Sequence, residues 1–87
     1  MELKETITLM TSENYKERFI AEYLQTKIRY EKLKYFCDQI ELAQKYGYNE
    51  PKHDCPLELL REQQRAMGIY LHNLELRAII ENINLKG

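Results

Sequence analysis

The sequence predicts an all-α protein, folded as an antiparallel two-helix hairpin with a short N-terminal segment and assembled as a homo-oligomeric helical bundle. Two long stretches contain no internal proline, and a short segment of turn-forming residues separates them. Apolar residues in both stretches recur every three to four positions, as they do along one face of an α-helix. We expect helices over about 12–46 and about 56–84, joined by a loop over about 47–55.

The chain is expected to divide into a short N-terminal segment and the hairpin. Residues 1–10 contain apolar side chains without a clear helical period and are expected to form an arm or a short helix, whereas 11–87 form the hairpin. Thr11 and Ser12 are favourable N-cap residues. Glu17 would place a negative charge near the positive end of the helix dipole.

The second helix is expected to begin at Pro56, because proline suits the first helical position. Asp54 or Cys55 would then be its cap. Gly68 is the one glycine inside this stretch and costs about 1 kcal/mol relative to alanine. Close approach of another backbone would explain a glycine at this position.

Each predicted helix carries apolar side chains on two faces, and a bare hairpin covers only one face of each. Leaving large apolar side chains in water costs about 1.5–3 kcal/mol each relative to burying them. We therefore expect the second faces to be covered by further copies of the chain, in a number that the pattern does not give. In the second helix one stripe consists of Leu60, Met67, Leu71, Leu74 and Ala78, and the second stripe, on the far side, consists of Ile69, Leu76, Ile80 and Ile83.

Composition excludes several classes of protein. The formal net charge of -1 argues against a globally basic DNA-binding protein. The content of 44% hydrophobic residues argues against disorder. No apolar run approaches the ~18 residues of a membrane span, and no signal peptide is recognisable, so we expect a cytoplasmic protein with reduced cysteines.

No pattern in the sequence indicates catalysis, a metal or a cofactor. Cys37, His53 and Cys55 do not have the paired spacing of a zinc site. His53 and Cys55 are nearly adjacent in a predicted loop, with no third residue to orient a nucleophile and its base. A glycine-rich phosphate loop is also absent from the sequence. We therefore expect a binding protein and not an enzyme.

Basic residues and tyrosines alternate in the segment 27–35, KIRYEKLKY. Arginine and lysine side chains hold phosphates, and a tyrosine ring stacks on a nucleobase. The alternative interpretation is an ordinary charged surface with helical pairs such as Arg18–Glu22. The candidate ligand-binding residues are Tyr15, Arg18, Arg29 and Lys32, followed by Lys27 and Tyr30.

The order of motifs in the two helices resembles a known family. The first helix contains Arg18-x3-Glu22 and then Arg29-x2-Lys32-Leu33, and the second contains Gln63-x3-Met67-x2-Tyr70-Leu71-x2-Leu74-Glu75-x-Arg77. Over roughly residues 14–80 the chain resembles the anti-CBASS sponges, small phage helical-hairpin proteins that sequester the cyclic oligonucleotide signals of bacterial antiviral defence. A similar hairpin occurs as a module in anti-Thoeris sponges.

The resemblance implies a hexamer of hairpins that binds cyclic dinucleotides, such as cGAMP, in pockets between protomers. Some members of the family also bind cyclic trinucleotides in separate pockets. The messenger would be held and not cleaved, in the cytoplasm of the bacterial host, so that the defence effectors are not activated. The alternative function is a structural or adaptor hairpin that binds a protein partner through its second apolar face. A small hydrolase of the same messengers is a third hypothesis.

The resemblance also implies roles for particular residues. Tyr15 matches the aromatic residue that stacks on a base, and Asn14 takes this place if the alignment shifts by one position. Arg29 matches the residue that contacts phosphate, with Lys32 as the second basic residue of the motif, and Arg18 matches a family arginine.

Two further positions bear on ligand binding. Arg65 is a candidate for a second pocket, without a motif to support it. Thr26 stands where the family commonly has leucine, a difference that bears on which ligand fits.

Overall fold

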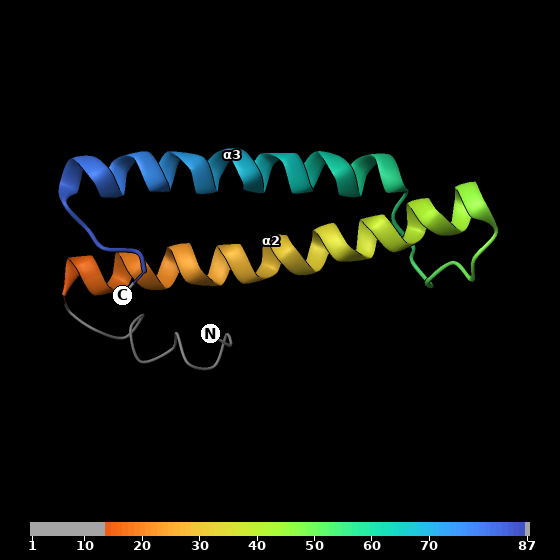
Figure 1. Ribbon diagram of the computed structural model, residues 1–87, viewed down its shortest axis with the longest axis horizontal. Coiled ribbons are helices and arrows are strands. Elements are labelled where there is room, and N and C mark those ends of the chain that lie inside the picture. The colour runs from red at the N-terminus through yellow and green to blue at the C-terminus, as the bar shows by residue number, and fades with distance from the viewer. Residues whose placement is uncertain (1–13, 87) are drawn as a thin grey trace.

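The computed structural model describes residues 14–86, which form two long α-helices joined by a loop (Figure 1). Helix α2 spans Tyr15–Tyr46, and helix α3 spans Leu57–Glu81. The helices lie side by side in opposite directions, and the chain after α3 returns to the start of α2 (Figure 1). The predicted all-α hairpin is therefore confirmed, whereas the arm expected over residues 1–10 lies outside the described residues.

Asn14 is the residue that starts α2. Its backbone is extended, and its Oδ1 accepts hydrogen bonds from the backbone N–H groups of Lys16 and Glu17 at 2.8 and 3.2 Å. A side-chain oxygen at this position satisfies amide groups that have no partner within the helix. The N-cap is thus Asn14, and not Thr11 or Ser12 as the sequence predicts.

Pro56 precedes α3 instead of occupying its first turn. Its backbone is extended, and its carbonyl oxygen accepts hydrogen bonds from the backbone N–H groups of Leu59 and Leu60 at 3.1 and 3.2 Å. No side chain caps this helix, so neither Asp54 nor Cys55 has the predicted role. The fixed φ of proline is compatible with the N-cap position and with the first helical position, so the sequence alone does not distinguish them.

Both helices end at a residue in the left-handed conformation. Gly47 follows α2 with φ 80°, a value that glycine adopts without steric cost. Asn82 follows α3 with φ 58°, and the N–H of Ile83 donates to the Ala78 carbonyl at 2.8 Å. This Schellman motif turns the chain back toward α2. As a result, α3 ends at Glu81, before the predicted boundary near residue 84.

The hydrophobic core lies between the two helices. On α3 it uses one of the two predicted stripes, in which Leu71, Leu74 and Ala78 are buried. Ile40 and Cys37 are fully buried on the part of α2 nearer the loop. Ile83, predicted for the second stripe of α3, belongs instead to the core, because the Schellman motif carries it over the helix pair. The main core cluster consists of Phe19, Tyr23, Leu71, Leu74, Ala78 and Ile83.

The outer face of α3 carries an uncovered apolar stripe. Its residues recur at the spacing of one helix face, and their exposed fractions range from 46% to 82%. We call this set the α3 outer stripe; it consists of Ile69, Leu76, Ile79 and Ile80. In the part of the chain that the structure describes, no helix has the length and hydropathy of a membrane span.

Gly68 marks a close approach between the helices, although the neighbour is a side chain. A Cβ atom at Gly68 would lie 3.3 Å from Cε1 of Tyr30. The sequence allowed for a second backbone at this position, and the structure places the ring of Tyr30 there. The small residue lets this tyrosine, which is half-buried, lie against α3.

Candidate functional site

The polar side chains that join the two helices form two edges of the hairpin. On α3 these edges lie about half a helical turn apart, because members such as Tyr70 and His72 are two residues apart along the helix. We call the first the Arg77 edge; it consists of Tyr15, Glu22, Tyr70, Arg77 and Glu81. We call the second the Tyr30 edge; it consists of Tyr23, Lys27, Tyr30, Arg65, His72 and Glu75.

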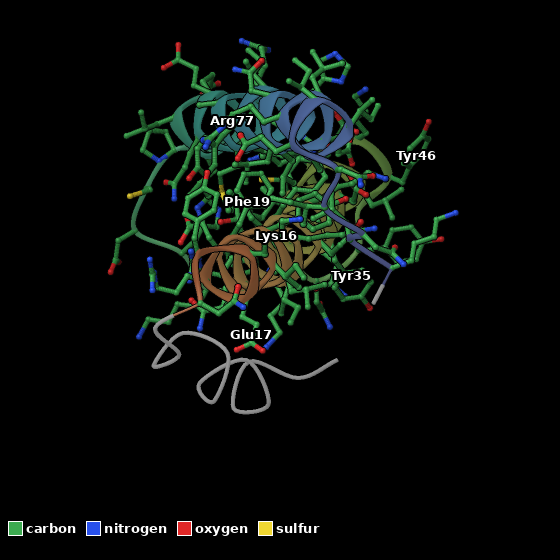
Figure 2. All side chains as sticks on the ribbon, turned by 90° about the vertical axis from the view of Figure 1, so that its left-hand side faces the viewer. Lys16, Glu17, Phe19, Tyr35, Tyr46 and Arg77 are labelled. Atoms are coloured by element: carbon green, nitrogen blue, oxygen red, sulfur yellow. The ribbon has the colours of Figure 1, made fainter. Side chains whose placement is uncertain are left out.

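Tyr15 lies at the open end of the Arg77 edge, in contact with the last turns of α3. Its hydroxyl donates to Oε1 of Glu81 at 2.8 Å and accepts from Nη2 of Arg77 at 2.7 Å. Arg77 also donates from Nε to Oε2 of Glu81 at 3.2 Å and lies 5.0 Å from the ring centre of Phe19. Figure 2, viewed along the hairpin, shows Arg77 on α3 facing Phe19 on α2.

These contacts change the acid–base properties of the Tyr15 cluster. The hydrogen bond to Glu81 raises the pKa of Tyr15, and Arg77 partly opposes this effect. The same hydrogen bond lowers the pKa of Glu81, with a further contribution from Arg77. The phenol of Tyr15 and the carboxylate of Glu81 therefore stay in the protonation states that suit a donor and an acceptor.

Glu22, a member of the quoted motif, is bound across the helix pair. Its Oε1 accepts from the hydroxyl of Tyr70 on α3 at 3.2 Å and from Thr26 on α2 at 3.2 Å. Burial, followed by the nearby Glu22, raises the pKa of Tyr70. Thr26 is buried, so the position where a leucine was expected is used for an internal polar contact.

The basic candidates of α2 point into solvent. Arg18, Arg29 and Lys32 are all exposed, and Arg29 lies seven residues after Glu22, on the same side of the helix. Arg29 and Lys32 form no ion pair with the other residues between 14 and 86. Their charges are thus available at the surface of a single hairpin.

The Tyr30 edge contains three adjoining clefts of about 740, 210 and 320 Å³. Tyr23, Lys27 and Glu75 line both the first and the second cleft, and Tyr30 lines both the second and the third. The hydroxyl of Tyr23 donates to Oε2 of Glu75 at 2.6 Å, and burial together with this bond raises the pKa of Tyr23 to about 12. Lys27 lies 5.8 Å from the centre of the Tyr23 ring.

The remaining candidates divide between these surfaces. Arg65 lines the third cleft together with Tyr30 and Arg61, so it lies on the Tyr30 edge and not beside Tyr15. Arg61 itself donates from Nη2 to Oδ1 of Asp38 at 2.9 Å. Asn14 uses its side-chain oxygen to cap α2, so this side chain has a structural role at the start of the helix.

Arg77 and Glu81 contact the candidate residue Tyr15, although the sequence assigned neither of them a role in binding. Arg77 stands in the motif Glu75-x-Arg77, and Glu81 follows it at the i,i+4 spacing of a helical pair. This spacing is a signal for their mutual contact. Their contact with Tyr15 joins residues 62 and 66 positions apart and has no local signal.

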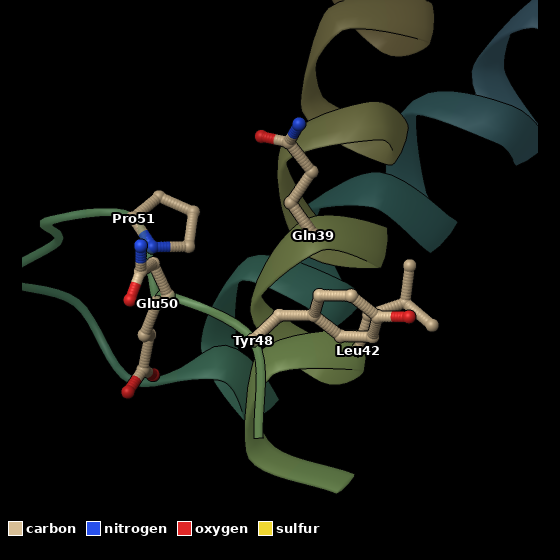
Figure 3. Close-up of a pocket in the computed structure, with 6 residues that line it drawn as sticks. Gln39, Leu42, Tyr48, Glu50 and Pro51 are labelled. Atoms are coloured by element: carbon tan, nitrogen blue, oxygen red, sulfur yellow. The ribbon is translucent and has the colours of Figure 1, made fainter. Parts of the chain in front are cut away.

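A further pocket of about 470 Å³ lies at the turn of the hairpin, between the last turns of α2 and the loop. Figure 3 shows the ring of Tyr48 alongside Leu42, with Glu50 and Pro51 on the loop. Tyr48 and Leu42 are both exposed. None of the predicted ligand-binding residues lines this pocket.

His53 closes the loop next to this pocket. Its Nε2 lies 2.9 Å from Oε1 of Glu50, and its Nδ1 lies 2.6 Å from the carbonyl oxygen of Cys55. Both neighbours are acceptors, so only the protonated ring donates to both. The hydrogen bond to Glu50 raises the pKa of His53 and lowers the pKa of Glu50.

These shifts predict a pH-dependent contribution of His53 to stability. The contribution of His53 is complete below its ordinary pKa of 6.5 and is lost as the pH rises through the raised value. The contribution of Glu50 is present above its ordinary pKa of 4.5 and is lost as the pH falls through the lowered value. We therefore expect Glu50→Gln to lower the pKa of His53 measured by NMR titration, and to lower the melting temperature more at about pH 5.5 than at about pH 8.5. Equal effects at both pH values would contradict this prediction.

The structure gives no indication of a metal site in the part of the chain that it describes. No group of three or more histidine, cysteine, aspartate or glutamate residues between 14 and 86 lies close enough together to hold an ion. Cys37 is a buried free thiol and Cys55 an exposed one. Burial raises the pKa of Cys37, which keeps this thiol protonated.

Comparison with known proteins identifies the family. The family model described as Sequestin matches residues 13–80, a span that contains both helices except the final residue of α3. No curated protein and no solved structure matches the chain significantly. The family name indicates a protein that sequesters a ligand, which is a binding role, and the match is consistent with the resemblance to the sponges. The chain belongs to the Sequestin family.

Proposed function

We propose that the protein sequesters cyclic oligonucleotide second messengers without cleaving them and so blocks antiviral signalling of the CBASS type in the bacterial cytoplasm. The observation that carries this proposal is the Sequestin match over residues 13–80, which gives the sequestering role. The nature of the ligand is inferred from the exposed tyrosine and basic side chains of α2. A cyclic dinucleotide presents two bases and two phosphates, which these side chains complement.

The positions of Tyr15 and Arg29 support a site shared between chains. They lie 14 residues apart on one continuous helix, which corresponds to about 21 Å along its axis at ~1.5 Å per residue. The resemblance implies pockets between protomers, and this separation is compatible with the two side chains reaching one ligand from different chains. We infer that Tyr15 of one protomer and Arg29 of another face the same ligand.

The α3 outer stripe supports the assembly that such a site needs. Ile80 is 82% exposed and Ile79 is 77% exposed in the single hairpin. Burying side chains of this size stabilises a complex by about 1.5–3 kcal/mol each. We propose a closed homo-oligomer, which by the resemblance is a hexamer, with the stripe covered by neighbouring copies.

A second site is assigned to the Tyr30 edge. Tyr30 and Lys27 line one of its clefts, and Arg65 joins Tyr30 in another, so an aromatic ring lies between basic residues there. We propose that this edge contributes to a separate pocket for a cyclic trinucleotide. It is on the opposite side of the hairpin from Tyr15, so the two ligands would not compete.

The energetics are compatible with tight binding. Stacking contributes about 1–3 kcal/mol per base, and a charge-assisted hydrogen bond about 1.5–3 kcal/mol. A few of each reach the roughly -12 kcal/mol of a nanomolar complex only when the site is ordered beforehand. Two rigid helices from neighbouring hairpins provide that order.

The α3 outer stripe also favours one other function, an adaptor that binds a different protein. The same exposed Ile79 and Ile80 would then be covered by the partner and not by a second copy. A chain that remains monomeric and becomes more stable only with such a partner would support the adaptor.

Native mass spectrometry with a mixture of cyclic di- and trinucleotides tests the proposal, because it reports assembly and ligand together. We expect an oligomer that retains cyclic nucleotides, and saturable binding by calorimetry. A linear dinucleotide with the same bases is the control, and we expect it to bind more weakly. Chromatography after heat denaturation should recover the ring intact. A cleaved product would indicate the hydrolase instead, and no binding of any cyclic nucleotide at high concentration would exclude the sponge.

A further inference from the structure

We propose that Arg77 and Glu81 of α3 are positioning residues that hold the ring of Tyr15 ready to stack on a ligand base. This inference rests on the proposed function, because it concerns how Tyr15 receives the ligand. It assigns a role to the end of α3, which contains no residue that the sequence assigned to binding.

The hydrogen bonds around Tyr15 form a closed triangle. The Tyr15 hydroxyl donates to one carboxylate oxygen of Glu81 at 2.8 Å and accepts from Arg77 at 2.7 Å. Arg77 donates to the other carboxylate oxygen of Glu81 at 3.2 Å. Each group is therefore held by the other two, and the hydroxyl end of Tyr15 has a defined position.

The triangle is itself fixed by the core. The guanidinium of Arg77 lies 5.0 Å from the ring centre of Phe19, which is buried, and the rings of Tyr15 and Phe19 are 6.2 Å apart. A guanidinium over an aromatic ring is attracted to its face. Arg77 is consequently held by Phe19 below and by Glu81 beside it.

Tyr15 nevertheless keeps much of its surface accessible. It is 48% exposed, although its hydroxyl is bound. A tyrosine in the first turn of a helix would otherwise sample several side-chain rotamers, and binding would have to restrict them. Because α3 already restricts the ring, a base that stacks on it loses less affinity to ordering.

The experiment compares three single variants by calorimetry with a cyclic dinucleotide as the probe. Tyr15→Phe keeps the ring and removes the hydroxyl, and Glu81→Ala removes its acceptor. We expect each to weaken binding about two- to tenfold, the range for leaving one such side chain unrestrained. Asp38→Ala is the matched control, because it removes a comparable carboxylate bond between the helices, from Arg61 at 2.9 Å, on the part of α2 nearer the loop.

A double variant and a titration separate positioning from stability. Tyr15→Phe combined with Glu81→Ala should bind about as well as either single variant, because each change breaks the same triangle. Glu81→Ala should also lower the raised pKa of Tyr15 in an ultraviolet titration without ligand. A purely structural role would lower the melting temperature in all variants, including Asp38→Ala, and leave the affinity unchanged.

The outcomes distinguish this inference from the proposed function. Binding by the natural chain with unchanged affinity in Tyr15→Phe would overturn the positioning role and leave the sponge intact. Absence of binding by the natural chain would overturn both. Weaker binding by Tyr15→Phe and Glu81→Ala, with Asp38→Ala unaffected, supports the positioning role.

Discussion

Ile80→Glu is expected to break the assembly into single hairpins and to abolish ligand binding. Ile80 is 82% exposed in the hairpin, so a charge there leaves the fold of one chain unchanged. In a packed oligomer the same carboxylate would be buried without a partner, which costs several kcal/mol. Native mass spectrometry should show the loss of the oligomer, and circular dichroism should show that the helices persist.

Gln63→Glu is the control for this variant, because it adds the same charge to α3 at an exposed position away from the α3 outer stripe. We expect the oligomer to survive this change. An Ile80→Glu protein with the mass of the natural assembly would contradict the role of the stripe. A monomer that still binds the ligand at full affinity would contradict the shared site.

Tyr15→Ala and Arg29→Ala are expected to cause the largest losses of affinity without changing the mass of the oligomer. Removal of the Tyr15 ring takes away stacking that is worth about 1–3 kcal/mol, or about 5- to 150-fold in affinity. Removal of Arg29 takes away a charge-assisted contact with phosphate of about 1.5–3 kcal/mol. Calorimetry for affinity and native mass spectrometry for assembly measure both effects.

Lys45→Ala is matched to Arg29→Ala, since it also removes one positive charge from an exposed position of α2. Lys45 lies near the loop and contacts Glu41 at 3.9 Å, in an exposed pair that contributes little to stability. We expect unchanged binding for this variant. If Arg29→Ala instead dissociates the oligomer, Arg29 is a residue of the interface and not of the ligand site.

The two helices differ in how well the sequence predicts where they end. The absence of proline and glycine between Asn14 and Gly47 predicts one continuous helix, and Gly47 predicts its end, because glycine most easily takes the left-handed conformation. The end of α3 carries a weaker signal, because asparagine takes this conformation less readily than glycine. Asn82 adopts it, and Ile83 joins the core between the helices.

In the candidate site, too, some features follow from helical spacing and others depend on contacts between the two helices. The spacing of Arg18 and Arg29 on α2 could be worked out from helical geometry, and both side chains are exposed. The partners of Tyr15 could not, because Arg77 and Glu81 reach it only after the chain has turned back on itself. The capping role of Asn14 likewise did not follow from the sequence, because Thr11 and Ser12 are also favourable caps.

The sequence by itself determined that this protein is a pair of long amphipathic helices. Helix propensity, the positions of proline and glycine, and the spacing of apolar residues are all properties of residues close together in the sequence. Only the tertiary structure decided which apolar stripe of α3 is buried with Ile83 and which remains exposed with Ile80. It also decided that Tyr15 is bound by α3. Contacts between residues far apart along the chain depend on the crossing of the two helices, and no local pattern encodes that geometry.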